Sequence, residues 1–286
     1  MSEEKFVQGD VRSFDFAGLA RENVAEMLPY IPGKPILEVQ EEYGLGKVIK
    51  LSSNECPFGL PPGLGEAVAK AAVGSNRYPD AMCRRLRAKV AKKLGVGEEN
   101  LIFSNGAEEG IRLIAQIFLN HGDAAVIPTP IFDAYSVATR LMGAREICLP
   151  LKASRIDLAS ILLACEQNTD VKLVWLCSPS NPTGDILKKQ ELDNFLACLP
   201  QNIMVVLDEA YAEFVTNVHS DSHPGIGNQV HTLQLCFTNE SGVFSCCKDF
   251  RIAIPVGCDL HKIEGEIAYP PARTPILHHG RELLFI

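Results

Sequence analysis

Between residues 101 and 211 the chain alternates short apolar runs with longer amphipathic segments. The apolar runs predict strands at 101–106, 124–128, 146–151, 171–177 and 203–211. The amphipathic segments that follow the first four runs predict helices at 107–122, 132–143, 157–166 and 188–199. Buried strands separated by helices are typical of an α/β fold, a mostly parallel sheet sandwiched by helices. Asp157 is the expected N-cap of the third helix, and Gly122 the expected end of the first.

The pattern is weaker on both sides of this region. Residues 19–31 are a helical patch that Pro29 and Pro32 interrupt. Residues 47–63 predict a short strand that runs into a loop rich in proline and glycine, and residues 83–95 predict a helix. Beyond about residue 215 only 232–237 predicts a further strand.

Composition narrows the class of partner. The net charge of −8 disfavours nucleic acid and anionic membranes, which would need a basic face. No apolar run is as long as a membrane span, and the first ten residues lack the order of a secretion signal, so we expect a cytoplasmic protein. Ten scattered cysteines without CxxC spacing then predict reduced thiols rather than disulfides.

Chemistry-bearing residues follow the predicted strands. Because ligands of an open parallel sheet bind beyond the carboxyl ends of its strands, these positions are the candidate site. The set comprises an anion cradle at residues 105–108, the aromatic Phe132, the amide Asn181, the carboxylate Asp208 and the phenol Tyr211. Each also has an ordinary structural explanation, such as a tight turn, a core aromatic or a paired strand-end carboxylate. Together they suit a phosphorylated, planar, nitrogen-containing cofactor, pyridoxal 5'-phosphate, which also requires a lysine.

Longer motifs support this interpretation. "SPSNPTG" at 178–184, followed by "VVLDEAYAEF" at 205–214 and preceded by "NRYPD" at 76–80, resembles the class I/II, fold-type I aminotransferases. The resemblance covers residues 15–214 and is greatest to the histidinol-phosphate aminotransferases. It implies a large pyridoxal-phosphate domain at 36–258, with part of a small domain near its start, behind an N-terminal arm at 1–35.

The resemblance also implies roles for individual residues. Ala107 and Glu108 would lie at the cofactor phosphate. Phe132 would lie on the pyridine ring. Asn181 and Tyr211 would hold the ring oxygen, and Asp208 the ring nitrogen. Asn54 would lie near the substrate carboxylate, and Tyr78 would reach the phosphate site of a second subunit, so a homodimer is implied.

The lysine that attaches the cofactor has two candidate positions. In "LCFTNESGVFS" the expected interval from Asp208 places Asn239 where the family has lysine. In "FSCCKDFRIAIPVGC" the lysine is kept as Lys248, with Pro255 at the position of the family's arginine. We favour Lys248 because the residues after it match better. Residues 259–286 match no part of the family pattern, so we expect a diverged tail and a small domain that is largely missing.

The leading functional hypothesis is transamination between histidinol phosphate and 2-oxoglutarate, giving imidazole-acetol phosphate and glutamate in histidine biosynthesis. The alternatives are another pyridoxal-phosphate enzyme of the class, either an aromatic aminotransferase or a phosphothreonine decarboxylase, and a degenerate homologue without catalysis. A third hypothesis is a metal site in the tail. Its candidate ligands are His219, His223, His231, Cys236, Cys246 and Cys247. Pro224 and Gly225 predict a loop there, which favours solvated histidines instead.

Overall fold

The structure is a computed structural model that describes residues 17–29, 31–56, 58–215, 231–237 and 249–254. In the last two ranges it describes the backbone alone. Lys248 and Asn239 therefore lie outside the described residues, as do the tail residues from 255 onward.

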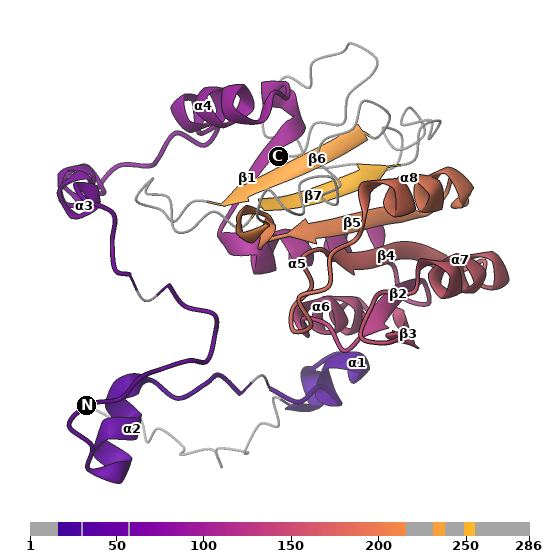
Figure 1. Cartoon of the computed structure of the whole chain (residues 1–286), viewed down its shortest axis with the longest axis horizontal. Coiled ribbons are helices and arrows are strands. Elements are labelled where there is room, and N and C mark those ends of the chain that lie inside the picture. The colour runs from indigo at the N-terminus through magenta and orange to yellow at the C-terminus, as the bar shows by residue number, and fades with distance from the viewer. Residues whose placement is uncertain (1–16, 30, 57, 216–230, 238–248, 255–286) are drawn as a thin grey trace, which may run out of the picture.

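The described elements form one seven-stranded sheet in the order β1-β6-β7-β5-β4-β2-β3 (Figure 1). Its strands are β1 (Leu101–Ser104), β2 (Ala124–Thr129), β3 (Arg145–Pro150), β4 (Val171–Cys177), β5 (Met204–Glu209), β6 (His231–Phe237) and β7 (Asp249–Ile254). All neighbouring pairs are parallel except those of β7, which is antiparallel to both β5 and β6. The prediction of a mostly parallel sheet is confirmed, whereas β7 was not foreseen.

Eight α-helices accompany this sheet within the described residues. They are α1 (Glu22–Ala25), α2 (Ile36–Tyr43), α3 (Leu64–Ala72), α4 (Arg84–Leu94), α5 (Gly106–Phe118), α6 (Ala134–Leu141), α7 (Leu158–Gln167) and α8 (Lys189–Cys198). Short 3₁₀ turns occur at Ala17–Leu19, Glu98–Asn100 and Ala212–Phe214. The Asp157 carboxylate accepts hydrogen bonds from the backbone N–H (3.3 Å) and hydroxyl (2.8 Å) of Ser160, which confirms it as the cap of α7.

Helix α5 ends earlier than the sequence predicts. Leu119 is already extended, with φ −111° and ψ 125°, and only 2% of it is exposed. The Asp123 carboxylate then accepts from the Asn120 N–H at 2.8 Å. Gly122, the predicted end of the helix, lies instead at φ +89° in the turn that leads into β2. The helix thus ends at Phe118, before the glycine is reached.

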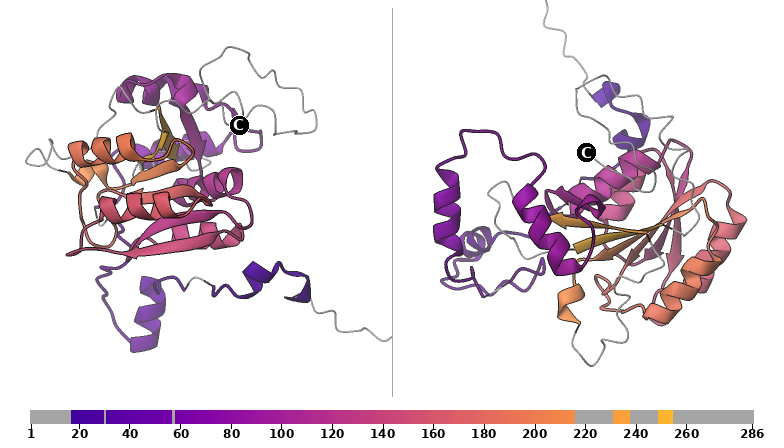
Figure 2. Two further views of the ribbon diagram at one scale, coloured as in Figure 1. Left: turned by 90° about the vertical axis from the view of Figure 1, so that its right-hand side faces the viewer. Right: turned by 90° about the horizontal axis from the view of Figure 1, so that it is seen from above.

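Helices cover both faces of the sheet (Figure 2). Because side chains alternate along a strand, β4 contributes Leu173, Trp175 and Cys177 to the core beneath α5 and α6. Its Val174 and Leu176 belong to the opposite core, beneath α7 and α8. This double burial explains why the sequence of β4 is apolar almost without interruption.

The N-terminal part of the described chain contributes little to these cores. Helices α1, α2 and α3 contain no buried residue. Asn23 ties α1 to the end of α6, donating through Nδ2 to the carbonyls of Arg140 (2.6 Å) and Leu141 (3.1 Å). Asn23 thereby adds a donor to the last turn of α6, where the Arg140 carbonyl also accepts from the Gly143 N–H at 2.8 Å.

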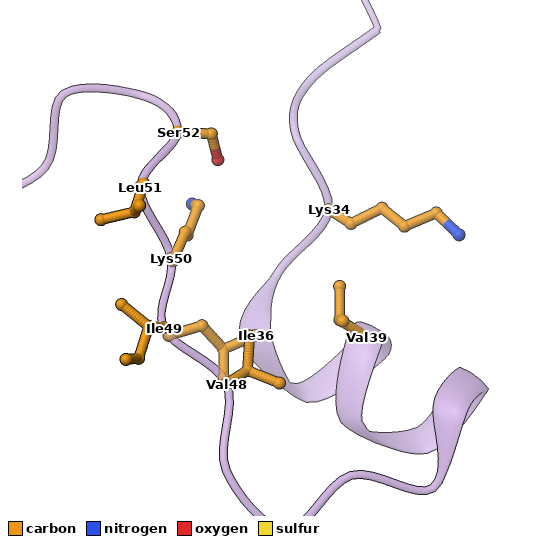
Figure 3. A pocket seen from close by; sticks show the side chains of 8 residues that line it. All are labelled: Lys34, Ile36, Val39, Val48, Ile49, Lys50, Leu51 and Ser52. Carbon is orange, nitrogen blue, oxygen red and sulfur yellow. The ribbon is translucent and has the colours of Figure 1, made fainter.

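The short strand predicted at the start of 47–63 is absent. Residues 47–51 have no strand partner within the described chain, and Ile49 and Leu51 remain 75% and 90% exposed. An extended segment becomes a strand only where another backbone accepts and donates its hydrogen bonds. Instead, residues 48–52 line an apolar groove of about 270 Å³ with Ile36 and Val39 of α2 (Figure 3).

Within the described residues, no helix has both the length and the apolar character needed to cross a membrane.

Candidate functional site

Asp208 lies at the centre of the carboxyl edge of the sheet, because β5 is the middle strand. Asp208 lies near the end of β5, beside Cys177 of β4, and is 3% exposed. Its Oδ1 accepts from the Ala210 N–H at 2.8 Å, and its Oδ2 accepts from the Tyr135 hydroxyl at 2.7 Å. Donors on both oxygens therefore hold the buried Asp208 carboxylate in one orientation.

Tyr135 is a site residue that the sequence reasoning missed. It is 0% exposed in α6, and its ring contacts Phe132 edge-on at 5.9 Å and stacks on Trp175 at 5.4 Å. Trp175 is held in turn by its indole N–H, which donates to the Thr139 hydroxyl at 3.2 Å. The signal available in the sequence was the three-residue spacing from Phe132, which places both residues on one side of the start of α6.

Burial controls protonation around Asp208. Desolvation, and secondarily the negative charge of Asp208, raise the pKa of the Tyr135 phenol well above its usual value. The same two causes, in the same order, raise the pKa of the Cys177 thiol to about 12. Tyr135 therefore remains a hydrogen-bond donor to Asp208 at neutral pH, and Cys177 remains a thiol rather than a nucleophilic thiolate.

Two predicted site residues from distant parts of the chain are in contact. The Asn54 side-chain amide donates to the Tyr211 hydroxyl at 2.9 Å, across 157 residues of sequence. Asn54 adopts φ +51°, a left-handed conformation that asparagine tolerates better than most residues. The Asn54–Tyr211 hydrogen bond connects the exposed N-terminal segment to the carboxyl edge of the sheet.

Helix α5 starts at the carboxyl end of β1, as expected for an anion cradle. Asn105 precedes the helix without a side-chain cap, and Gly106 adopts φ +82° with no atom near the position of a Cβ. Ala107 is buried, while the Glu108 side chain is exposed and forms an ion pair with Arg112. The first N–H groups of α5 carry the partial positive charge that anions prefer, and the Arg112 pair offsets the Glu108 charge beside them. The Asn105 N–H, just before the helix, already donates to the Glu109 carboxylate.

The loop after β4 presents Asn181, which is half-buried. The neighbouring Ser180 is 4% exposed, and its hydroxyl has no hydrogen-bond partner among the described residues. Phe132 is partly buried and packs against the core beneath α5 and α6. The predicted residues of the sheet edge thus occur at the ends of the expected strands, and the loop beside Asn181 contains a buried hydroxyl that a ligand could satisfy.

Other predicted residues are not brought to this edge. Tyr78 is exposed over its whole surface in the described chain. Its role at the phosphate site of a second subunit stays a prediction. No group of three or more potential metal ligands occurs among the described residues. The predicted tail ligands lie outside those residues, or, for His231 and Cys236, in a strand described by its backbone alone.

Comparison with known proteins identifies the family. The model of the family "aminotransferase class I and II" matches residues 46–237, about two thirds of the chain. The chain belongs to this family. Members with similar sequences include the histidinol-phosphate aminotransferase of Moorella thermoacetica, 42% identical over 212 residues, which are 74% of this chain and 54% of that protein. The histidinol-phosphate aminotransferase of Bacillus pumilus is 37% identical over 258 residues, which are 89% of this chain and 68% of that protein.

Coverage of these aminotransferases is partial: the chain spans about half the length of most of the curated relatives it matches. Among solved structures, histidinol-phosphate aminotransferase from Sinorhizobium meliloti, in complex with pyridoxal 5'-phosphate, superimposes with a TM-score of 0.68 at 20% identity. That superposition covers 90% of this chain and 67% of the other. It confirms the fold-type I architecture predicted for this aminotransferase family member.

Proposed function

We propose that this chain binds pyridoxal 5'-phosphate at the carboxyl edge of the sheet and acts in transamination. The observation that carries the proposal is the buried Asp208 carboxylate, oriented by Tyr135 and by the Ala210 N–H. The edge fits the cofactor chemically, since the start of α5 and the Ser180 hydroxyl, which has no partner in the part of the chain that the structure describes, add polar groups at the same edge of the sheet. Bound there, the cofactor would supply an electron sink for negative charge developing on the substrate carbon.

The chain's own residues would each have a defined task. Asp208 would keep a proton on the ring nitrogen, while Asn181 and Tyr211 would donate to the ring oxygen. The amides of Ala107 and Glu108 would bind the phosphate, and Phe132 would cover one ring face. Asn54 would orient the substrate carboxylate from its position on Tyr211. Lys248 is our proposal for the covalent attachment and for proton transfer to the substrate.

The proposed substrates are histidinol phosphate and 2-oxoglutarate, in the cytoplasm. The support is that the curated relatives described above carry the name histidinol-phosphate aminotransferase. We further propose that residues 36–258 act as the cofactor-binding domain behind an arm at 1–35.

The decisive experiment is reductive trapping. Pyridoxal phosphate is added to the purified chain, the mixture is reduced with borohydride, and the modified peptide is identified by mass spectrometry. We expect the adduct on Lys248 and its loss in Lys248→Ala. Lys92→Ala, an exposed lysine of α4, is the control and should leave the adduct unchanged.

Two outcomes would contradict the proposal. The absence of any lysine-dependent adduct would favour the degenerate, non-catalytic homologue. With an adduct present, glutamate formation from 2-oxoglutarate should be faster with histidinol phosphate than with tyrosine. Faster turnover of tyrosine, or release of carbon dioxide from phosphothreonine, would replace the proposed substrate by one of the two alternatives.

We also propose a homodimer, supported by the apolar surface of the N-terminal segment. Large apolar side chains with at least four fifths of their surface exposed are Leu28, Ile31, Leu51, Phe58 and Val73. Large apolar side chains that remain exposed within one segment favour an interface with another chain. Sedimentation of the purified chain with saturating pyridoxal phosphate should give twice the mass of 31.2 kDa, whereas a single-chain mass would contradict the dimer.

A further inference from the structure

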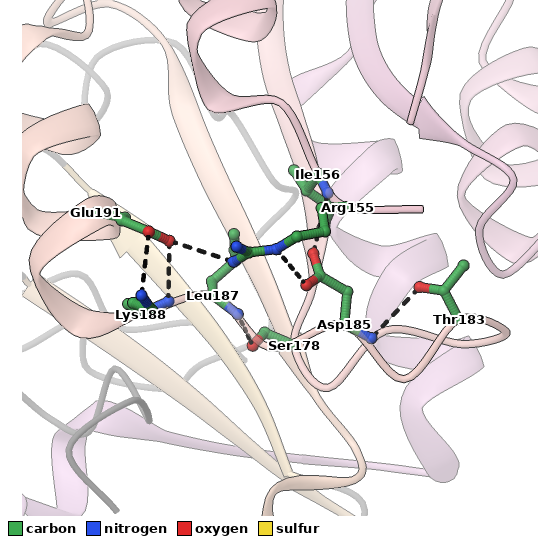
Figure 4. A network of polar contacts seen from close by, with 8 residues as sticks. All are labelled: Arg155, Ile156, Ser178, Thr183, Asp185, Leu187, Lys188 and Glu191. Carbon is green, nitrogen blue, oxygen red and sulfur yellow. Dashed lines mark hydrogen bonds and ion pairs between the residues drawn. The ribbon is translucent and has the colours of Figure 1, made fainter. Parts of the chain in front are cut away.

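A buried carboxylate joins the loop after β4 to the turn before α7 (Figure 4). The Asp185 side chain is only 8% exposed. Its Oδ1 accepts from the Arg155 guanidinium Nε at 3.0 Å, and its Oδ2 accepts from the Ile156 N–H at 3.0 Å. Both oxygens of one carboxylate are therefore held by the same short segment, which fixes the position and the orientation of the carboxyl plane.

The support on the Arg155 side is rigid. The turn between Lys152 and Arg155 is closed by two backbone hydrogen bonds, Lys152 N–H to the Arg155 carbonyl at 2.9 Å and the reverse at 3.0 Å. Its central residues, Ala153 and Ser154, adopt φ +51° and +62°, the left-handed pair that a tight two-residue turn requires. Glu191 of α8 lies 3.6 Å from the Arg155 guanidinium and provides a second carboxylate on its other side.

The loop itself is folded around Asn181. The Ser180 N–H donates to the Asp185 carbonyl at 2.8 Å, and the Gly184 N–H donates to the Ser180 carbonyl at 2.7 Å. The Leu187 N–H donates to the Ser178 hydroxyl at 3.0 Å, which closes the loop at its base. Asn181 lies inside the ring that Ser180 and Asp185 close, so a displacement of Asp185 is transmitted to the backbone that carries the Asn181 amide.

We propose that Arg155 and Asp185 are positioning residues for the cofactor site: their ion pair fixes the loop at 178–187 and thereby holds the Asn181 amide at the carboxyl edge. The part that concerns the cofactor rests on the proposed function, because Asn181 is there the donor to the ring oxygen. Neither Arg155 nor Asp185 touches the cofactor in this proposal. They act through the loop, so their removal should reproduce part of the effect of removing Asn181.

The first test needs no cofactor. Hydrogen exchange of the free chain is measured by mass spectrometry for Asp185→Asn, Arg155→Ala and Arg155→Lys. We expect peptides covering 178–187 to exchange about tenfold faster in Asp185→Asn and Arg155→Ala, since losing a charged hydrogen bond shifts an opening equilibrium by roughly that order. Arg155→Lys should recover part of the protection because it keeps the charge but not the directed Nε–H donor.

The second test uses pyridoxal phosphate as the probe. Arg155→Ala should lower its affinity about fivefold to tenfold and shift the absorbance of the bound cofactor in the same direction as Asn181→Ala. The Arg155→Ala/Asn181→Ala double variant should bind no more weakly than Asn181→Ala, because both changes remove the same interaction. This non-additivity is a result that a general loss of stability would not produce.

Asp193→Asn is the matched control. Asp193 pairs with Lys189 at 2.6 Å within α8, the helix that follows the loop in sequence, and Asp193→Asn should match the wild type in both tests. Unchanged exchange in Asp185→Asn and Arg155→Ala would overturn the positioning role whether or not the cofactor binds. Faster exchange in a chain whose wild type binds no pyridoxal phosphate would support the loop restraint and refute the proposed function instead.

Discussion

Asp208→Asn is expected to weaken the binding of pyridoxal phosphate by roughly 30-fold or more. Removing one partner of a buried, hydrogen-bonded charge pair costs about 2–5 kcal/mol, and each 1.4 kcal/mol is a factor of about ten in affinity. Asparagine has nearly the same shape, and its amide can accept from the Ala210 N–H while donating to the Tyr135 hydroxyl, so the variant should fold. Without the negative charge, the proton on the ring nitrogen loses its stabilising partner. Equilibrium titration followed by cofactor absorbance measures the change.

Asp170→Asn is the control for this substitution. Asp170 pairs with Arg145 at 2.8 Å immediately before β4, at the amino edge of the sheet and therefore opposite the proposed site. The pair is half-exposed, and such pairs contribute about 0–1 kcal/mol, so its cofactor affinity should stay within a few-fold of the wild type. Unaltered binding in Asp208→Asn would show that Asp208 does not contact the ring nitrogen and would remove the main support for the site.

Trp175→Ala is expected to lower the free energy of unfolding by about 3–5 kcal/mol, the usual cost of truncating a buried aromatic side chain to alanine. Trp175 has no exposed surface, stacks on Tyr135 at 5.4 Å and donates to the Thr139 hydroxyl. Its loss leaves a cavity beside the interior strand β4, a buried hydroxyl without its donor, and Tyr135 without its stacking partner. Trp175 is the single tryptophan of the chain, so the variant has no tryptophan fluorescence to report unfolding. Urea denaturation should therefore be followed by circular dichroism.

Two further variants separate the causes of this loss. Trp175→Phe keeps an aromatic ring against Tyr135 and should be destabilised less than Trp175→Ala. Leu163→Ala, at a side chain of α7 that is 52% exposed, should change stability by about 0.5 kcal/mol or less. A Trp175→Ala chain as stable as Leu163→Ala would mean that β4 does not form the middle of the core.

The sequence by itself determined the local elements and the chemistry at the strand ends. Examples are the apolar runs of β4 and β5, the end of α4 at Gly95 and the Asp157 cap of α7. Each depends on residues within a few positions of one another, so the sequence pattern predicts it. Parallel strands share one carboxyl edge, which is why Asn181, Asp208 and Tyr211 could be assigned to one region before any coordinates were known.

The tertiary structure decided which groups meet. Strand β7 lies between β5 and β6, Asn54 binds Tyr211 across 157 residues, and Tyr135 donates to Asp208. In each case the two segments are far apart in the chain, and the sequence of one does not indicate that the other is its partner. Residues 47–51 are an example of the opposite case. Their composition suits a strand, but no described strand pairs with them. Propensity acts between near neighbours, whereas pairing and burial depend on the whole folded chain.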